Sequence, residues 1–278
     1  MRSSVGCIVS WIERRLPVGT GIGIGLALIS AFLPAGCLET STLIRVARDG
    51  SGTIEQTFLI TSRFMELIAN TDRAVDWEPS ELVDEDELRE QAGRIGKNVS
   101  LVSAVPVVAE NGVGYTVTYR FEDVSKIRVN QNPGEIGLSS ADNTADESQG
   151  ESLGFEFTAG DPALLTVLCP PLPEGGGQTR SVQLDQETLQ MIQAIYQDMQ
   201  LHISVEVEGT IVATNAMYHD ASVVTILAID FGTALGDKRV LAQLATADPE
   251  SVQELKSVLS KGPGISIEPR QEVTISFR

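Results

Sequence analysis

The chain has little of the side-chain chemistry on which most catalytic sites depend. Among its 278 residues only His202 and His219 are histidines. The Gly-x-Ser-x-Gly, His-Glu-x-x-His and Cys-x-x-Cys patterns and the phosphate-binding lysine loop are missing. Strand alternation places His202 opposite the apolar face of its strand, and His219 stands in a predicted turn, so both are interpreted as surface residues. We therefore expect no enzymatic activity, no metal and no other cofactor.

Positive charge is also scarce. The chain carries 20 Lys and Arg residues against 38 Asp and Glu residues, which gives a net charge of -18 at pH 7. A surface of that sign repels phosphates and anionic lipid head groups, so we expect no nucleic-acid partner. Two carboxylates can suffice for a hydrolase. However, the acidic run from Asp84 to Glu87 is more simply the electronegative first turn of a helix, and a hydrolase is the least favoured hypothesis.

One long apolar run is present, and it lies near the N-terminus. Positively charged residues, Arg2 and the pair Arg14 and Arg15, precede the apolar stretch Val18 to Phe32. Small residues and Cys37 follow. This order is typical of a signal peptide. The segment is also about long enough to span a bilayer, so an uncleaved membrane anchor is the alternative interpretation.

Residues Leu33 to Cys37 resemble the lipobox of bacterial lipoproteins. The resemblance implies cleavage between Gly36 and Cys37 and a lipid on the Cys37 thioether, usually together with an N-terminal acyl chain such as palmitate. Pro34 departs from the pattern, because families usually have Leu at that position. The resemblance places the protein in the bacterial cell envelope, on the extracytoplasmic side of a membrane, held there by its lipid anchor.

Cleavage would leave a more acidic chain with one free cysteine. It removes three arginines and one glutamate, which leaves 17 basic and 37 acidic residues of the original 20 and 38. Cys7 leaves with the signal and Cys37 takes the lipid. Cys169 is then alone, so no intramolecular disulfide can form. We interpret Cys169 as a small buried hydrophobic residue, because no catalytic-cysteine motif surrounds it.

The rest of the chain alternates between strand and helix patterns. Only Leu38 to Ser41 separate Cys37 from the first predicted strand, so that strand would be held close to the bilayer. Ser80 is a candidate cap for the second helix. Strands are predicted over 42–48, 53–60, 98–108, 114–121, 153–157, 164–168, 203–207, 211–216, 222–229 and 265–277, and helices over 62–70, 79–92, 183–200 and after Asp248.

Three short motifs occur in a familiar order: Asp49 to Thr53, Gly114 to Val124 and Val207 to Ala216. With the lipidated cysteine before them, they resemble the LppM-like bacterial lipoproteins. The resemblance covers roughly Cys37 to Ile229 and implies an α+β domain with a curved antiparallel sheet. For some members it also implies binding of membrane lipids or glycolipids, and it brings no catalytic residues. The second hydrophobic segment common in that family is missing here.

These observations predict an α+β fold in which a curved, mainly antiparallel β-sheet packs against a few α-helices. The predicted organisation is a lipoprotein signal peptide over 1–36, an LppM-like domain over 37–230 with a mobile acidic loop at about 130–152, and a C-terminal helix and strand extension over 231–278. The extension is expected to pack on the same domain.

Two functions of different kinds agree with this fold. The favoured one is a lipid-anchored, non-enzymatic protein that binds a lipid, a glycolipid or another apolar envelope ligand between the sheet and the helix Gln183 to Gln200. The alternative is an envelope interaction or assembly protein that acts through a protein partner.

Overall fold

The computed structural model describes residues 38–69, 79–131, 152–171, 190, 193, 197–240, 256 and 262–278. The predicted signal peptide over 1–36, Cys37 and most of the acidic loop lie outside the described residues. So do most of the predicted helix Gln183 to Gln200 and nearly all of the helix predicted after Asp248.

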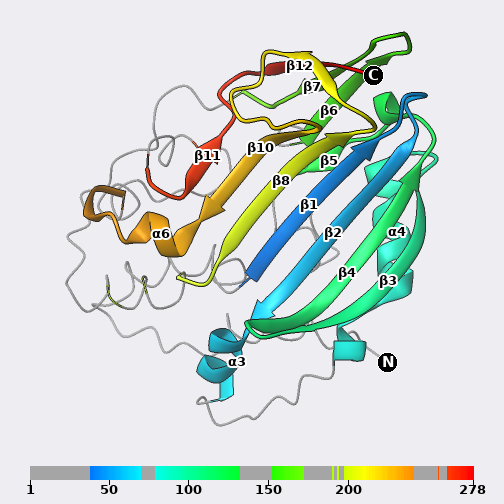
Figure 1. Ribbon diagram of the computed structural model, residues 1–278. Coiled ribbons are helices and arrows are strands. Elements are labelled where there is room, and N and C mark those ends of the chain that lie inside the picture. The colour runs from blue at the N-terminus through cyan, green and yellow to red at the C-terminus, as the bar shows by residue number, and fades with distance from the viewer. Residues whose placement is uncertain are drawn as a thin grey trace.

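The described chain is an α+β fold, as predicted, but it is built on two sheets and not one (Figure 1). The larger sheet has seven strands in the order β11-β10-β8-β1-β2-β4-β3, and the smaller has five in the order β5-β6-β7-β12-β9. All pairings are antiparallel except that of β1 with β8. The strands are β1 Leu38–Val46, β2 Gly52–Thr61, β3 Ser100–Ala109, β4 Gly112–Phe121, β5 Val129–Asn130, β6 Ser152–Thr158, β7 Ala163–Leu168, β8 Gln200–Val207, β9 Ile211–Thr214, β10 Val223–Asp230, β11 Ile265–Ile267 and β12 Glu272–Phe277.

Helices are few among the described residues. A 3₁₀ helix over Pro79–Leu82 precedes α4, and α4 packs beside β3 and β4 (Figure 1). The helices are α3 Ser62–Ala69, α4 Glu85–Ile95 and α6 Phe231–Leu235, with a second 3₁₀ helix over Val124–Lys126.

The second predicted helix begins later than expected. Its cap is Asp84, whose carboxylate accepts hydrogen bonds from the backbone N–H groups of Asp86 and Glu87 at 3.0 and 3.2 Å. The prediction that Ser80 caps this helix is therefore wrong, since Ser80 lies in the preceding 3₁₀ turn. The acidic first turn does stand at the positive end of the helix dipole, as expected.

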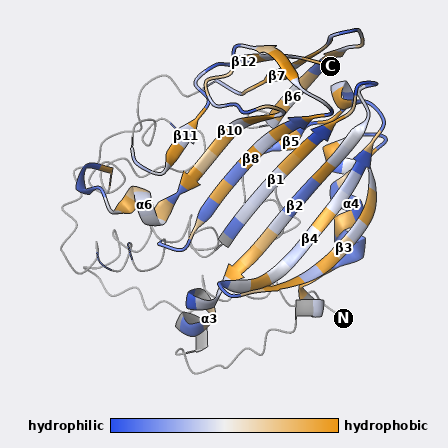
Figure 2. Cartoon of the chain, in the orientation of Figure 1, coloured by the Kyte–Doolittle hydropathy of each residue, from blue (hydrophilic) through white to orange (hydrophobic). Residues whose placement is uncertain are grey.

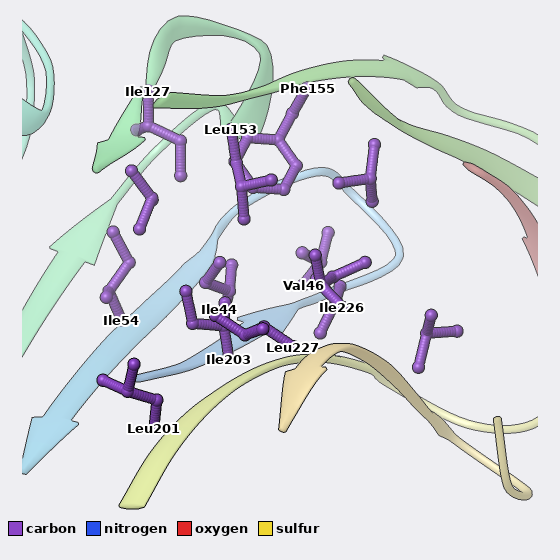
Figure 3. Close-up of a cluster of buried hydrophobic side chains, with 14 of the residues drawn as sticks. Ile44, Val46, Ile54, Ile127, Leu153, Phe155, Leu201, Ile203, Ile226 and Leu227 are labelled. Atoms are coloured by element: carbon purple, nitrogen blue, oxygen red, sulfur yellow. The ribbon is translucent and has the colours of Figure 1, made fainter. Parts of the chain in front are cut away.

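The core lies between the two sheets. Alternate residues of the seven-stranded sheet point to this side, and Figure 2 shows the resulting change of hydropathy along the strands. In Figure 3 side chains from β1, β2, β8 and β10 converge with those of β6 and the segment before β5. The labelled members are Ile44, Val46, Ile54, Ile127, Leu153, Phe155, Leu201, Ile203, Ile226 and Leu227, all buried.

The C-terminal segment contributes strands to both sheets. β11 pairs with β10 at the edge of the larger sheet, and β12 pairs with β7 and β9 in the smaller one. Val273, Ile275 and Phe277 of β12 are fully buried. The last strand thus completes the smaller sheet.

Candidate functional site

The predicted lipid-attachment residue stands directly before a central strand. Cys37 and Gly36 lie outside the described residues, but Leu38 is already the first residue of β1. β1 pairs with β2 on one side and with β8 on the other. A lipid on Cys37 would therefore be joined, without a flexible tether, to the middle of the seven-stranded sheet. We call the end of the sheet at which β1 begins the Cys37 end.

A row of apolar residues crosses four strands at the Cys37 end. Leu38 pairs with Ile60, Ile60 with Val113, and Val113 with Val108. Ile60 is buried, Val113 is half-buried, and Val108 at the open edge is 73% exposed. Apolar residues thus occupy this row from Leu38, next to the predicted anchor, to Val108 at the outer edge of the sheet.

The turn between β3 and β4 is tied to its neighbours at this end. The Asn111 side-chain Nδ2 donates a hydrogen bond to Oε2 of Glu39 in β1 at 2.6 Å. The Asn111 carbonyl accepts the N–H of Ser62, the first residue of α3, at 2.8 Å. One residue of the turn therefore fixes the turn, the start of β1 and the start of α3 relative to one another.

The inner face of the sheet carries an aromatic pair near the Cys37 end. Thr40 pairs with Phe58, and Phe58 with Tyr115. The Phe58 and Tyr115 rings stack with centroids 5.6 Å apart. Burial, together with the Glu87 charge, raises the pKa of Tyr115 above its usual range. These rings give this part of the interior an apolar wall, with the Thr40 hydroxyl beside it.

A polar side chain, Gln56, lies on the inner face in the next row of paired residues away from the Cys37 end. Gln56 lies between Thr42 of β1 and Val117 of β4, and it is only 3% exposed. Its Oε1 has no hydrogen-bond partner among the described residues. A buried acceptor left without a donor costs about 1–3 kcal/mol. The interior therefore offers a hydrogen-bond acceptor beside an aromatic wall, close to the Cys37 end.

The opposite face of the sheet has the character of a solvated surface. Arg45 of β1 forms ion pairs with Glu55 of β2 at 3.1 Å and with Glu206 of β8 at 2.9 Å. Burial lowers the pKa of Arg45, but the hydrogen bonds to both glutamates outweigh it and the net shift is upward. The hydroxyls of Thr57 and Thr116 share a hydrogen bond of 2.9 Å nearby. Such half-exposed pairs contribute little to stability.

The two histidines are exposed, as the sequence predicts. His202 is on the outer face of β8, where partial desolvation by its neighbours lowers its pKa, and His219 pairs by an isolated bridge with Val224. Within the described part of the chain, no three His, Cys, Asp or Glu side chains are grouped so that they could hold a metal ion.

Cys169 follows β7 and packs partly buried against the core. Burial raises the pKa of its thiol to about 11. The thiol is therefore protonated at neutral pH, which agrees with its interpretation as a small hydrophobic residue and not as a nucleophile.

Comparison with known proteins identifies one distant structural likeness. No family model matches the chain, and no curated protein sequence matches it. A search of solved structures finds the NMR structure of the folded domain of LppM from Mycobacterium tuberculosis, with 9% identity and a TM-score of 0.31. The alignment covers 88% of this chain and 91% of that domain. A likeness this distant carries no argument, so the LppM-like relationship stays a prediction from the sequence motifs.

None of the helices that the structure describes is long and apolar enough to cross a bilayer.

Sequence reasoning missed Gln56 and Asn111. A signal for Gln56 was available, because it occupies a core position in the alternation of Ile54, Phe58 and Ile60. Asn111 precedes Gly112 in an Asn-Gly pair that is typical of hairpin turns, but its contacts to β1 and α3 depend on pairings between distant segments.

Proposed function

We propose that this chain is a lipid-anchored lipoprotein of the bacterial cell envelope that binds a lipid or another apolar envelope ligand near the bilayer and catalyses no reaction. The anchor rests on the lipobox-like residues Leu33 to Cys37. The observation that carries the proposal is that β1 begins at Leu38 in the middle of the large sheet. Whatever the sheet binds at the Cys37 end is then bound beside the membrane.

The inner face near that end suits an amphiphilic ligand. The Phe58 and Tyr115 rings supply apolar contact, and Gln56 Oε1 supplies an acceptor for a hydroxyl or amide donor. Thr42, which pairs with Gln56, is four residues from Leu38, a distance of about 13 Å along a strand. A lipid whose polar group reaches Gln56 would therefore have its apolar part close to the bilayer.

The anchor is tested by metabolic labelling. Cells that express the full chain are fed a clickable fatty acid, and the wild type is compared with Cys37→Ala. Label on the wild type that is lost in Cys37→Ala supports the anchor. An unlabelled wild type contradicts it and favours the uncleaved membrane segment.

Ligand binding is tested on the purified full chain. Organic solvent extracts non-covalent lipid but leaves lipid that is covalently bound to Cys37, and mass spectrometry quantifies the extract. We expect Gln56→Leu to retain less lipid than the wild type. The control Thr53→Leu makes the same kind of change on the outer face of the same strand, and it should retain the wild-type amount. No lipid in the wild type, or equal amounts in all three proteins, would count against the proposal.

One observation favours the partner-dependent alternative. β3 is an edge strand of the large sheet, and it exposes Val102, Val105 and Val108. Exposed edges invite pairing with another chain. However, Pro106 and the bulge between Leu101 and Ser103 interrupt this edge, and both features discourage strand addition. Crosslinking in cells that recovers one stoichiometric protein partner, with no lipid in the extract, would favour this alternative.

The hydrolase hypothesis gains no support from the described residues. Glu268 is the one buried carboxylate among them. It already accepts hydrogen bonds from Arg270 at 3.0 Å and from the Met217 N–H at 2.6 Å. A glycosidase-like pair would need a second carboxylate beside it.

A further inference from the structure

Val108 is the most exposed large hydrophobic residue in the part of the chain that the structure describes. Its exposed fraction is 73%, against 54% for Val105 and 44% for Val212. It stands two residues before the β3–β4 turn, at the outer end of the apolar row that begins with Leu38. Strand spacing of about 4.8 Å puts it roughly 14 Å to the side of Leu38, at the same level along the sheet.

The hairpin tip that carries Val108 is held in place. Asn111 donates to Glu39 and accepts from Ser62, so the turn is fixed to β1 and α3. A Cβ added to Gly112 would lie 2.3 Å from the carbonyl oxygen of Ile60, which shows how closely β2 packs on the turn. A rigid, exposed apolar tip stands beside the residue that follows Cys37.

Three features decide what would cover Val108. The segment that precedes the described residues ends at Cys37, whose predicted lipid would bring a bilayer to this end of the sheet. Pro106 and the bulge discourage a pairing strand on the β3 edge. Among the described charged side chains at this end, Glu39, Glu66 and Glu110 outnumber Arg63, so attraction to anionic lipids is not the cause of contact. An uncharged bilayer surface is the partner that fits.

We propose that the β3–β4 hairpin tip inserts Val108 into the interfacial region of a zwitterionic bilayer, so that the large sheet contacts the membrane at its Cys37 end. The inference rests on the lipid anchor of the proposed function and adds the orientation of the domain. Val105 serves as the reference position on β3, because it is three residues, or about 10 Å, further from the tip. Strand alternation puts it on the other face of the sheet, where it pairs with Thr116.

The test measures the depth of single probes. The full lipidated chain, in a Cys169→Ala background, carries an environment-sensitive fluorophore at Val108→Cys, Val105→Cys or Val212→Cys. Val212 is the matched control, since β9 lies toward the opposite end of β1, where Glu208 bonds to Val46. Each protein is reconstituted in phosphatidylcholine vesicles with and without nitroxide-labelled lipid. Fatty-acid labelling of the same preparation establishes whether the anchor is present.

We expect a blue-shifted emission at 108 and quenching by nitroxide lipid several-fold stronger than at 105, with no quenching at 212. Added anionic lipid is expected to leave the emission at 108 unchanged or to weaken the contact, because this end is acidic, and added salt is expected not to weaken it. Equal quenching at 108 and 105 would mean that the β3 edge lies flat on the bilayer, and it would overturn the proposed orientation.

Two further results separate this inference from the proposed function. If the protein carries the fatty-acid label and binds vesicles, but the probe at 108 stays in water, the anchor is supported and the tip contact is overturned. A blue shift at 108 that nitroxide lipid does not quench indicates a protein cover, such as a second copy, and also overturns it. An unlabelled protein that does not bind vesicles overturns the anchor and the tip contact together.

Discussion

The Tyr119 hydroxyl donates a hydrogen bond to Oε1 of Gln91 across 3.0 Å, and this buried contact joins the large sheet to α4. Tyr119 is fully buried on the inner face of β4, and Gln91 is 8% exposed on the helix. α4 is the described helix that covers this side of the sheet behind β3 and β4 (Figure 1). Its attachment therefore includes a polar contact within an interface where Leu88, Ala92 and Ile95 are also buried.

We expect Tyr119→Phe to lower the free energy of unfolding by about 1–2 kcal/mol at neutral pH, because it leaves the Gln91 oxygen without its donor. The difference is expected to shrink with rising pH. Burial raises the pKa of Tyr119 above its usual range, so the unfolded tyrosine ionises first and the wild type loses stability as pH rises above about 10. The loss of free energy of unfolding is about 1.4 kcal/mol per pH unit for this group. Tyr119→Phe does not show this loss, because phenylalanine has no hydroxyl to ionise. Urea unfolding at pH 7, 9 and 11 measures the effect.

Gln91→Leu provides the control for this experiment. It breaks the same contact but keeps the tyrosine, so its destabilisation should persist or grow at high pH. The double variant Tyr119→Phe with Gln91→Leu is expected to be closer to wild type at pH 7 than the sum of the two single variants. A difference in free energy of unfolding between Tyr119→Phe and the wild type that stays constant from pH 7 to 11 would contradict the assigned titration of Tyr119.

Gly114 of β4 is required by the close approach of β2. A Cβ at this position would lie 1.8 Å from the carbonyl oxygen of Phe58. We expect Gly114→Ala to lower the free energy of unfolding by about 2 kcal/mol or more, because two backbone segments must separate to admit the methyl group. The midpoint of urea unfolding measures this loss.

Gly93→Ala is the matched change at a permissive site. Gly93 is exposed within α4, and an added Cβ would meet no atom within 4 Å. Alanine has a higher helix propensity than glycine, so we expect this variant to be more stable than wild type by about 0.5–1 kcal/mol. Equal effects of the two substitutions would refute the steric explanation.

Local sequence patterns predicted most of the elements, because each pattern depends on near neighbours. The alternation of Tyr115, Val117 and Tyr119 with polar residues indicates one buried face, and these three side chains are buried in β4. The Asn111-Gly112 pair is typical of a hairpin turn, and β3 and β4 do pair across it. The parallel pairing of β1 with β8 joins residues about 160 positions apart, and no local pattern encodes it. For the same reason the sequence did not predict a second sheet completed by β12.

The candidate site was predictable only in part. The lipid-attachment residue Cys37 stays a prediction from the signal pattern. The row from Leu38 to Val108 exists only through pairing of four strands, which no local pattern predicts. Gln56 is a polar residue at an apolar position of the alternation, a signal that the sequence analysis did not use. Whether that position is buried depends on which elements cover the sheet, and this is a property of the tertiary structure.

Cys169 is expected to react slowly in the folded protein. Its pKa of about 11 leaves roughly one thiolate per thousand at pH 8, whereas an unfolded cysteine with a pKa near 8.5 is about a quarter ionised. Iodoacetamide should therefore modify the folded chain about 200-fold more slowly than the chain in urea. Mass spectrometry of the peptide that contains Cys169 measures both rates. Similar rates would show that the thiol is neither buried nor shifted.

Asp84 and Ser80 give a direct comparison of two cap candidates. Only Asp84 accepts the N–H groups of the first turn of α4, and Glu87 follows it at the three-residue spacing of a capping box. We expect Asp84→Ala to cost about 1 kcal/mol of stability, because two N–H groups lose their acceptor and the helix loses a negative charge at its N-terminus. Ser80→Ala should change stability by less than about 0.5 kcal/mol, since Ser80 is exposed in the preceding turn. Thermal unfolding followed by circular dichroism measures both variants. A larger loss for Ser80→Ala than for Asp84→Ala would show that α4 begins where the sequence first suggested.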